Sequence, residues 1–241
     1  MKTNAIVDKF AESSKFVDKE NTPFVWRKLR PDEAILAYQL HLTANAVTPA
    51  GLVRLDDLAH FSANIQDQGR ILGCFVNDNE MVAYGILGMD TASNSKLCKL
   101  LDLPETELHN FASLDGAAAL APWRGNRLHR ESIQARLAMA REQQRRYIGA
   151  TVSPENINSM RGLLEAGFCI KNFAYLYGGL ARLVMSLDLD APPSYWTLCG
   201  AVIASDQAGH QAALAKDLIG FDLTETRSGV CQVLYGVRKN G

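Results

Sequence analysis

The residues from Asp115 to Ile133 constrain the fold most, because their pattern predicts a strand, a tight turn and a helix in succession. Ala117 to Ala121 is too small and apolar for a surface loop, and Pro122 ends this run. From Leu128 onward, apolar residues return at near-helical spacing. The first N–H groups of a helix lack intrahelical partners, and the peptide dipoles add partial positive charge there. The turn Arg124-Gly125-Asn126-Arg127 is therefore predicted to cradle a phosphate.

This turn resembles motif A of the GNAT superfamily, the acyl-CoA-dependent N-acyltransferases, whose pyrophosphate loop is written Q/R-x-x-G-x-G/A. Arg124 matches the first position, whereas Arg127 and His129 stand where the family prefers small residues. A second block, from Asn156 to Gly167-Phe168, is similar to the superfamily's N-x-x-A…G-F segment, with the same number of residues from Asn to Gly-Phe. The two blocks occur in the right order, and the resemblance extends from about residue 24 to residue 190.

The resemblance implies a site for acetyl-CoA as cosubstrate and no metal. Backbone donors from Gly125 to Arg130 would hold the pyrophosphate, and the backbone of Ala118 to Leu120 would run beside the pantetheine. Asn156 would contact the pantetheine or adenosine arm, although an ordinary helix N-cap would also explain this asparagine. The residues expected to bind the cofactor are Ala118, Ala119, Leu120, Arg124, Gly125, Asn126, Arg127, Leu128, His129, Arg130 and Asn156.

Acyl transfer to an amine needs a general base, since the attacking nitrogen must be neutral. Asp115 is the candidate, because partial burial among small residues would raise its pKa towards a useful range. The alternative is a turn residue at the start of a strand. Many relatives place a tyrosine general acid seven residues after Asn156, where this chain has Leu163. Tyr175 and Tyr177 on the next predicted strand are the nearest phenols and are therefore the candidate acids.

The order of elements predicts an α/β fold of the α+β type, in which helices flank a mixed central sheet. Strand, helix, helix, strand and strand precede the phosphate turn, and the strand–helix–strand pattern after it implies parallel pairing. We divide the chain into a mobile arm (1–22), a GNAT acyltransferase domain (23–190) and a C-terminal extension (191–241). Residues 90–111 are expected to form an irregular insertion that covers the site.

The C-terminal extension has a β-α-β-β pattern. Residues Trp196 to Ile203 show no polar alternation, so we expect this strand to be buried on both faces and the extension to add β structure to the sheet. The extension would pack on the domain or join two chains as a homodimer.

Composition limits the partners. The net charge of −1 and the pI near 6.5 give no bulk electrostatic reason to bind nucleic acid or a membrane surface. Five widely spaced cysteines without a C-x-x-C pair suit core thiols in a reducing compartment, and no apolar run resembles a signal peptide or a membrane span. We expect a cytoplasmic protein with a small-molecule amine as substrate.

The function implied by the resemblance is transfer of an acetyl group from acetyl-CoA to a primary amine by direct attack. The alternative is a catalytically silent CoA-binding or regulatory module. The missing motif A glycines and Leu163 motivate this second hypothesis.

Overall fold

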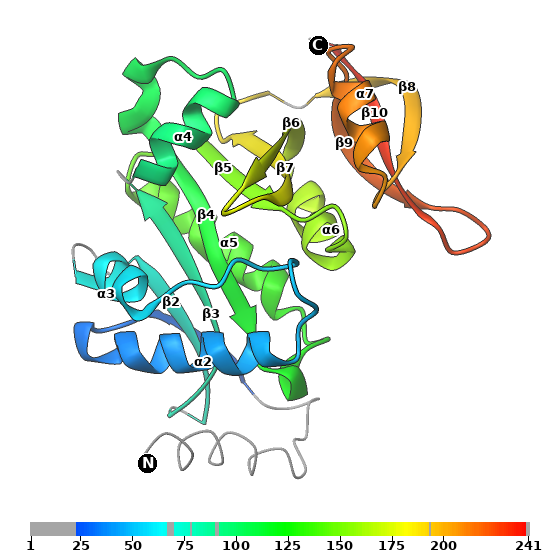
Figure 1. Ribbon diagram of the computed structural model, residues 1–241. Coiled ribbons are helices and arrows are strands. Elements are labelled where there is room, and N and C mark those ends of the chain that lie inside the picture. The colour runs from blue at the N-terminus through cyan, green and yellow to red at the C-terminus, as the bar shows by residue number, and fades with distance from the viewer. Residues whose placement is uncertain (1–22, 67–69, 78, 90–91, 193, 240–241) are drawn as a thin grey trace.

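The computed structural model describes residues 23–66, 70–77, 79–89, 92–192 and 194–239 (Figure 1). The predicted arm at 1–22 lies outside the described residues. A ten-stranded sheet runs through the molecule in the order β1-β2-β3-β4-β5-β7-β6-β9-β10-β8. Neighbouring strands pair antiparallel except β4 and β5, which are parallel, so the predicted mixed sheet is confirmed. The strands are β1 (Val25–Lys28), β2 (Ile71–Val76), β3 (Glu80–Met89), β4 (Phe111–Ala119), β5 (Tyr147–Val152), β6 (Cys169–Leu176), β7 (Leu180–Asp188), β8 (Tyr195–Ile203), β9 (Ile219–Glu225) and β10 (Cys231–Lys239).

Helices cover both faces of the sheet (Figure 1). The cluster under α2 and α3 contains Ile86 of β3, whereas the cluster under α5 and α6 contains its neighbour Leu87. Successive strand residues point to opposite faces, so β3 separates the two cores. The helices and 3-10 turns are η1 (Pro31–Glu33), α2 (Ala34–Ala46), α3 (Leu58–Gln66), α4 (Ala92–Leu100), η2 (Glu105–Asn110), η3 (Ala121–Trp123), α5 (Leu128–Glu142), α6 (Ile157–Glu165) and α7 (Gln207–Leu214).

The two parallel strands separate halfway along their length. Their pairing ends at Leu114 and Ala150, after which residues 117–119 of β4 pair only with β3. The last residues of β5 pair only with β7. On its other side β4 carries a bulge, because Gly85 lies opposite Ala117 whereas Leu87 lies opposite Leu114. A bulge bends its strand, and a gap therefore opens between β4 and β5.

The insertion at residues 90–111 differs from the predicted irregular segment, because its described part contains two helical elements, α4 and η2. Leu97 and Cys98 of α4 pack against Phe111 and Val184. None of the described insertion residues lines the groove presented below, so this segment does not cover it. The few apolar residues of α4 gave a weak periodic signal, and burial against the strands stabilises the helix instead.

The C-terminal extension continues the sheet of its own chain, as predicted, with β9 beside β6. Leu223, Val233 and Tyr235 join the larger apolar core. The prediction that residues 196–203 are buried on both faces is wrong, because β8 is the edge strand and Leu198 is 58% exposed. The apolar content of a strand does not determine its position in the sheet. No helix in the described ranges is long and apolar enough to cross a membrane.

Candidate functional site

A groove of about 740 Å³ runs from the N-terminus of α5 along the free part of β4, a volume typical of ligand sites. A smaller cavity of about 110 Å³ adjoins it in the gap between β4 and β5. Both are bordered by the loop after α2 and by the first turn of α6. The residues that line both spaces are Leu52, Val53, Ala117, His129, Asn156 and Ser159.

The turn before α5 presents a row of backbone donors to the groove. Gly125 and Arg127 both have left-handed backbone, with φ of 89° and 60°. The N–H groups of residues 125–130 donate to no acceptor within the described part of the chain. Consecutive N–H groups at a helix N-terminus form an anion-binding concavity. Arg127, Arg130 and Arg161 line the same end, where the only acidic lining residue in the described ranges is Glu165.

Arg124 lies differently from the expectation that its charge faces a phosphate. Its guanidinium donates to the carbonyl oxygens of Ala44 at 2.9 Å and Ala119 at 3.2 Å, and to the Thr48 hydroxyl at 3.3 Å. Ala44 belongs to the last turn of α2, where carbonyl groups lack helical partners. Arg124 therefore ties the turn to α2 and closes one wall of the groove.

His129, in place of a small residue, is accommodated by the facing helix. A Cβ at Gly162 of α6 would lie 2.9 Å from the His129 ring, so only glycine leaves room for the imidazole. The Nε2 atom is buried without a hydrogen-bond partner. Burial, reinforced by the charge of Arg136, lowers the pKa of His129 to about 4. The ring is therefore neutral at physiological pH.

All predicted cofactor residues except Leu120 and Asn126 line the groove. Leu120 is buried at the end of β4, and the Asn126 amide donates to the Trp123 carbonyl. Asn156 has the N-cap role, since its Oδ1 accepts a hydrogen bond from Ser159 N at 3.2 Å, and it also borders both spaces.

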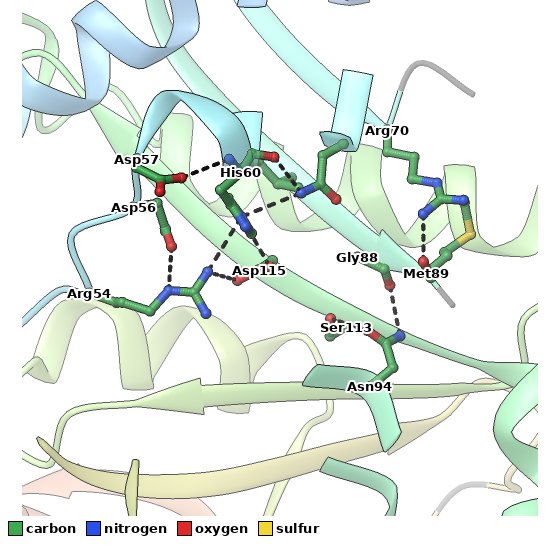
Figure 2. Close-up of polar contacts among 12 residues, drawn as sticks. Arg54, Asp56, Asp57, His60, Arg70, Gly88, Met89, Asn94, Ser113 and Asp115 are labelled. Carbon is green, nitrogen blue, oxygen red and sulfur yellow. Dashed lines mark hydrogen bonds and ion pairs between the residues drawn. The ribbon is translucent and has the colours of Figure 1, made fainter. Parts of the chain in front are cut away.

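Asp115 lies in the middle of β4, not at its start, and belongs to a polar cluster on the smaller cavity (Figure 2). Arg54 bridges two carboxylates, with Nε 2.5 Å from Asp56 Oδ1 and Nη2 3.0 Å from Asp115 Oδ1. The second Asp115 oxygen is 3.4 Å from His60 Nε2. The Asp115 side chain is only 16% exposed, so its charge is held largely away from water.

The pKa of Asp115 moves opposite to the prediction. Burial raises it, as expected, but the hydrogen bond with His60 and the charge of Arg54 outweigh burial, and the pKa falls below its usual value. For His60, burial lowers the pKa, but the bond to Asp115 and the nearby carboxylates raise it overall. The cluster therefore holds Asp115 ionised and makes His60 the stronger proton acceptor of the pair.

No protein-family model matches the sequence, and no curated protein is similar enough in sequence to count as a relative. Solved structures do match. An acetyltransferase of the GNAT family from Listeria monocytogenes superposes with a TM-score of 0.53 at 14% identity, over 70% of this chain and 100% of that one. A proposed acetyltransferase from Salmonella typhimurium, with its cofactor acetyl-CoA, superposes with a TM-score of 0.53 at 14% identity, over 69% of this chain and 94% of that one. The ribosomal-protein-S18-alanine N-acetyltransferase from Escherichia coli superposes with a TM-score of 0.50 at 14% identity, over 71% of this chain and 97% of that one.

The fold is that of the GNAT acetyltransferases. The resemblance drawn from the two sequence blocks and the tertiary structure therefore agree on the fold class. At 14% identity the likeness concerns the backbone alone, so the roles of individual residues depend on the geometry of this chain.

Of the two candidate acids, Tyr175 and Tyr177, only Tyr177 lines the smaller cavity. Its hydroxyl is 3.2 Å from Thr151 Oγ1, and the Arg54 guanidinium lies 4.7 Å from its ring centroid. Tyr177 has a φ of 52°, which is rare for a bulky residue and is often found at functional sites. Tyr175 is 60% exposed and contacts Gln207 of α7 outside the cavity. Leu163 lines the cavity as an apolar side chain.

Sequence reasoning missed Arg54, Asp56, His60 and Arg182, of which all but His60 line the smaller cavity directly. The first three follow the turn-rich loop after α2, where the alternation of Arg54 and Asp56 was the only local signal. Arg182 lies on β7, far from the phosphate turn in sequence. Only the packing of the α2–α3 loop and of α3 over β4 brings Arg54 and His60 together with Asp115.

Proposed function

We propose that this protein is an N-acetyltransferase that moves an acetyl group from acetyl-CoA to a primary amine by direct attack. The observation that carries the proposal is the gap between β4 and β5, which begins beside the unpaired N–H groups of residues 125–130 and ends at the cluster around Asp115. A phosphate-binding end and a proton-accepting end thus lie along one groove.

The role of each predicted cofactor residue follows from its place in the groove. The N–H groups of residues 125–130, with the charges of Arg127 and Arg130, would hold the pyrophosphate. The unpaired edge of β4 at Ala117, Ala118 and Ala119 would follow the pantetheine arm, since these residues pair only with β3. Arg124 would contribute by fixing the turn, and Asn156 by capping α6 at the edge of the groove.

The chemistry would take place in the smaller cavity. Asp115, held ionised at working pH, accepts the proton of the amine and shares it with His60, whose raised pKa suits the final acceptor. The neutral nitrogen attacks the thioester carbonyl, and the C–S bond breaks as the amide forms. Tyr177 is the candidate that protonates the departing thiolate, because Leu163 offers no proton.

A catalytically silent CoA-binding module is the second candidate, favoured by the apolar Leu163. A thermal shift with acetyl-CoA, followed by a thiol-release assay over a panel of amines, separates the two. We expect stabilisation by acetyl-CoA and transfer to at least one amine. Stabilisation without transfer to any amine would favour the silent module, and absence of CoA binding would reject both.

A further inference from the structure

The smaller cavity carries an excess of buried positive charge. Three arginines and two aspartates are among its lining residues, and the acetyl thioester of the proposed reaction is uncharged, so this charge is available to the acceptor. The charged residues are Arg54, Asp56, Asp115, Arg136 and Arg182.

Both carboxylates are already engaged by one arginine. Arg54 contacts Asp56 at 2.5 Å and Asp115 at 3.0 Å, and it stacks over Tyr177. Within the described residues, neither Arg136 nor Arg182 forms an ion pair with a carboxylate. Neither of these two buried cations therefore has a carboxylate in contact with it, and the five charged groups together leave an excess of one positive charge.

Arg136 is held in place by the fold. Its Nε donates to the Ser132 carbonyl oxygen, its Nη1 donates to the carbonyl oxygens of Ile86 and Asp115, and Gly85 leaves the space that it fills. These bonds anchor α5 to the sheet and fix the position of this guanidinium.

Arg182 has a hydrogen-bond donor that the fold does not use. The residue is 3% exposed, its Nη1 donates to the Ala181 carbonyl, and its Nη2 is buried with no hydrogen-bond partner in the described ranges. Its Cζ lies 6.0 Å from the Tyr177 ring centroid. A buried charged donor without an acceptor destabilises a fold, and a carboxylate would satisfy it.

We propose that Arg182 recognises an anionic group of the acceptor, so that the acceptor is a small amine that carries a carboxylate, as an α-amino acid does. This inference rests on the proposed acetyl transfer and names its substrate class. A carboxylate in the cavity would balance the excess charge. Because the remaining guanidinium groups repel an ammonium ion, they would also favour the neutral, nucleophilic form of the amine.

Product binding tests the inference without turnover. Protein saturated with CoA is titrated calorimetrically with N-acetylglycine, N-acetylalanine and N-acetylglutamine, each beside its carboxamide counterpart. We expect at least one acid to bind about tenfold or more tightly than its amide, the effect of one charge-assisted contact. Equal affinity for acid and amide in every pair would overturn the inference.

Variants of Arg182 test whether this residue causes the preference for the acid over its amide. Arg182→Gln should remove it, and Arg182→Lys should keep part, since lysine retains the charge but not the planar donor pair. Arg227→Gln, at an exposed turn of the extension, is the matched control and should keep the full preference. Unchanged affinity for acetyl-CoA shows that the variants are folded.

Transfer assays distinguish the remaining outcomes. A loss of kcat/KM in Arg182→Gln that is confined to carboxylate-bearing amines supports recognition. An equal loss for acids and amides would assign Arg182 to the transition state and overturn the inference. Transfer by the wild type to amines without any preference for a carboxylate would reject the substrate class while leaving the proposed function standing. Absence of all transfer, with acids still bound more tightly, would reject the acetyltransferase and keep the anion site.

Discussion

Two buried histidine–tyrosine pairs occur in the part of the chain that the structure describes, one beside the candidate site and one in the C-terminal extension. His41 of α2 lies 2.7 Å from the Tyr84 hydroxyl on β3, and His210 of α7 lies 2.8 Å from the Tyr235 hydroxyl on β10, each through Nδ1. All four side chains are almost inaccessible to solvent. Burial lowers the pKa of both histidines, so both are neutral.

The second ring nitrogen makes the pairs different. His210 Nε2 lies 2.8 Å from the Ala204 carbonyl, so it carries the proton and Nδ1 accepts from Tyr235. His41 Nε2 accepts from the Asp56 backbone N–H at 3.1 Å, so its proton is on Nδ1 and is donated to Tyr84. The backbone partner of Nε2 thus selects opposite tautomers for the two histidines, although each pairs with a tyrosine.

The consequence is a spare donor near the site. Tyr235 donates its hydroxyl hydrogen bond to His210 Nδ1, and the pair in the extension is complete. Tyr84 accepts a hydrogen bond from His41 Nδ1, and its own hydroxyl hydrogen has no acceptor within the described residues. Its oxygen lies 3.5 Å from where a Cβ on Gly116 would be, beside the bulge of β4. The pair in the extension serves packing, and we infer that the other pair also supports the site.

The largest expected effect concerns the carboxylates of the two regions. Asp115→Asn removes the proton acceptor, so kcat/KM should fall by about 100-fold or more. Asp206, which caps α7 through a bond to Gly209 N, is the matched control. Asp206→Asn should leave activity and stability nearly unchanged, because asparagine caps equally well. Activity of Asp115→Asn within threefold of the wild type would show that Asp115 is not the base.

Stability at low pH should depend on His129. Its pKa is about 4 in the folded protein and 6.5 when unfolded, so its contribution is present above pH 6.5 and lost as the pH falls towards 4. Over this window the free energy of unfolding should fall by up to about 3 kcal/mol from this group, and His210 acts in the same direction. Urea unfolding between pH 4 and 7 measures the slope. His129→Gln should flatten it, and an unchanged slope would contradict the assignment.

The two tyrosines give a direct test of the comparison. Tyr84→Phe removes the oxygen that accepts from His41 Nδ1, and Tyr235→Phe removes the hydroxyl that donates to His210 Nδ1. Each should lower the free energy of unfolding by about 1–3 kcal/mol, the usual effect of one unsatisfied buried group. Only Tyr84→Phe should also lower kcat/KM. If both variants affected activity equally, the functional difference between the pairs would disappear.

The smallest predicted effect is on cofactor affinity. Gly125→Glu places a negative charge where phosphate oxygens would lie, so the Kd for acetyl-CoA should rise at least about tenfold. Gly229 in the extension also has left-handed backbone, with a φ of 80°, and Gly229→Glu carries the same backbone strain far from the groove. The Gly229→Glu variant should bind acetyl-CoA with the same Kd as the wild type. Calorimetry measures both, and equal weakening in the two variants would attribute the effect to strain.

Local sequence information predicted the elements that local physics controls. The alanine run of β4, the turn at Gly125 and the apolar spacing of α5 were sufficient to place a strand, a turn and the start of a helix in succession. The N-cap alternative for Asn156 is confirmed, and its contact with the cofactor stays a prediction. Each of these features depends on neighbours in sequence, because turns, caps and helix periodicity are set within a few residues.

Tertiary structure decided the rest. Asp115 was recognised as a candidate, but its pKa direction depends on Arg54 and His60, which reach it from the loop after α2 and from α3. Arg182 becomes an unpaired cation only because β7 lies beside β5. The tautomer of a histidine follows from the partner of its second nitrogen. Charge and proton positions are set by contacts between segments distant in sequence. The sequence patterns therefore predicted the fold class and the turn that opens α5, whereas only packing assembled the polar cluster.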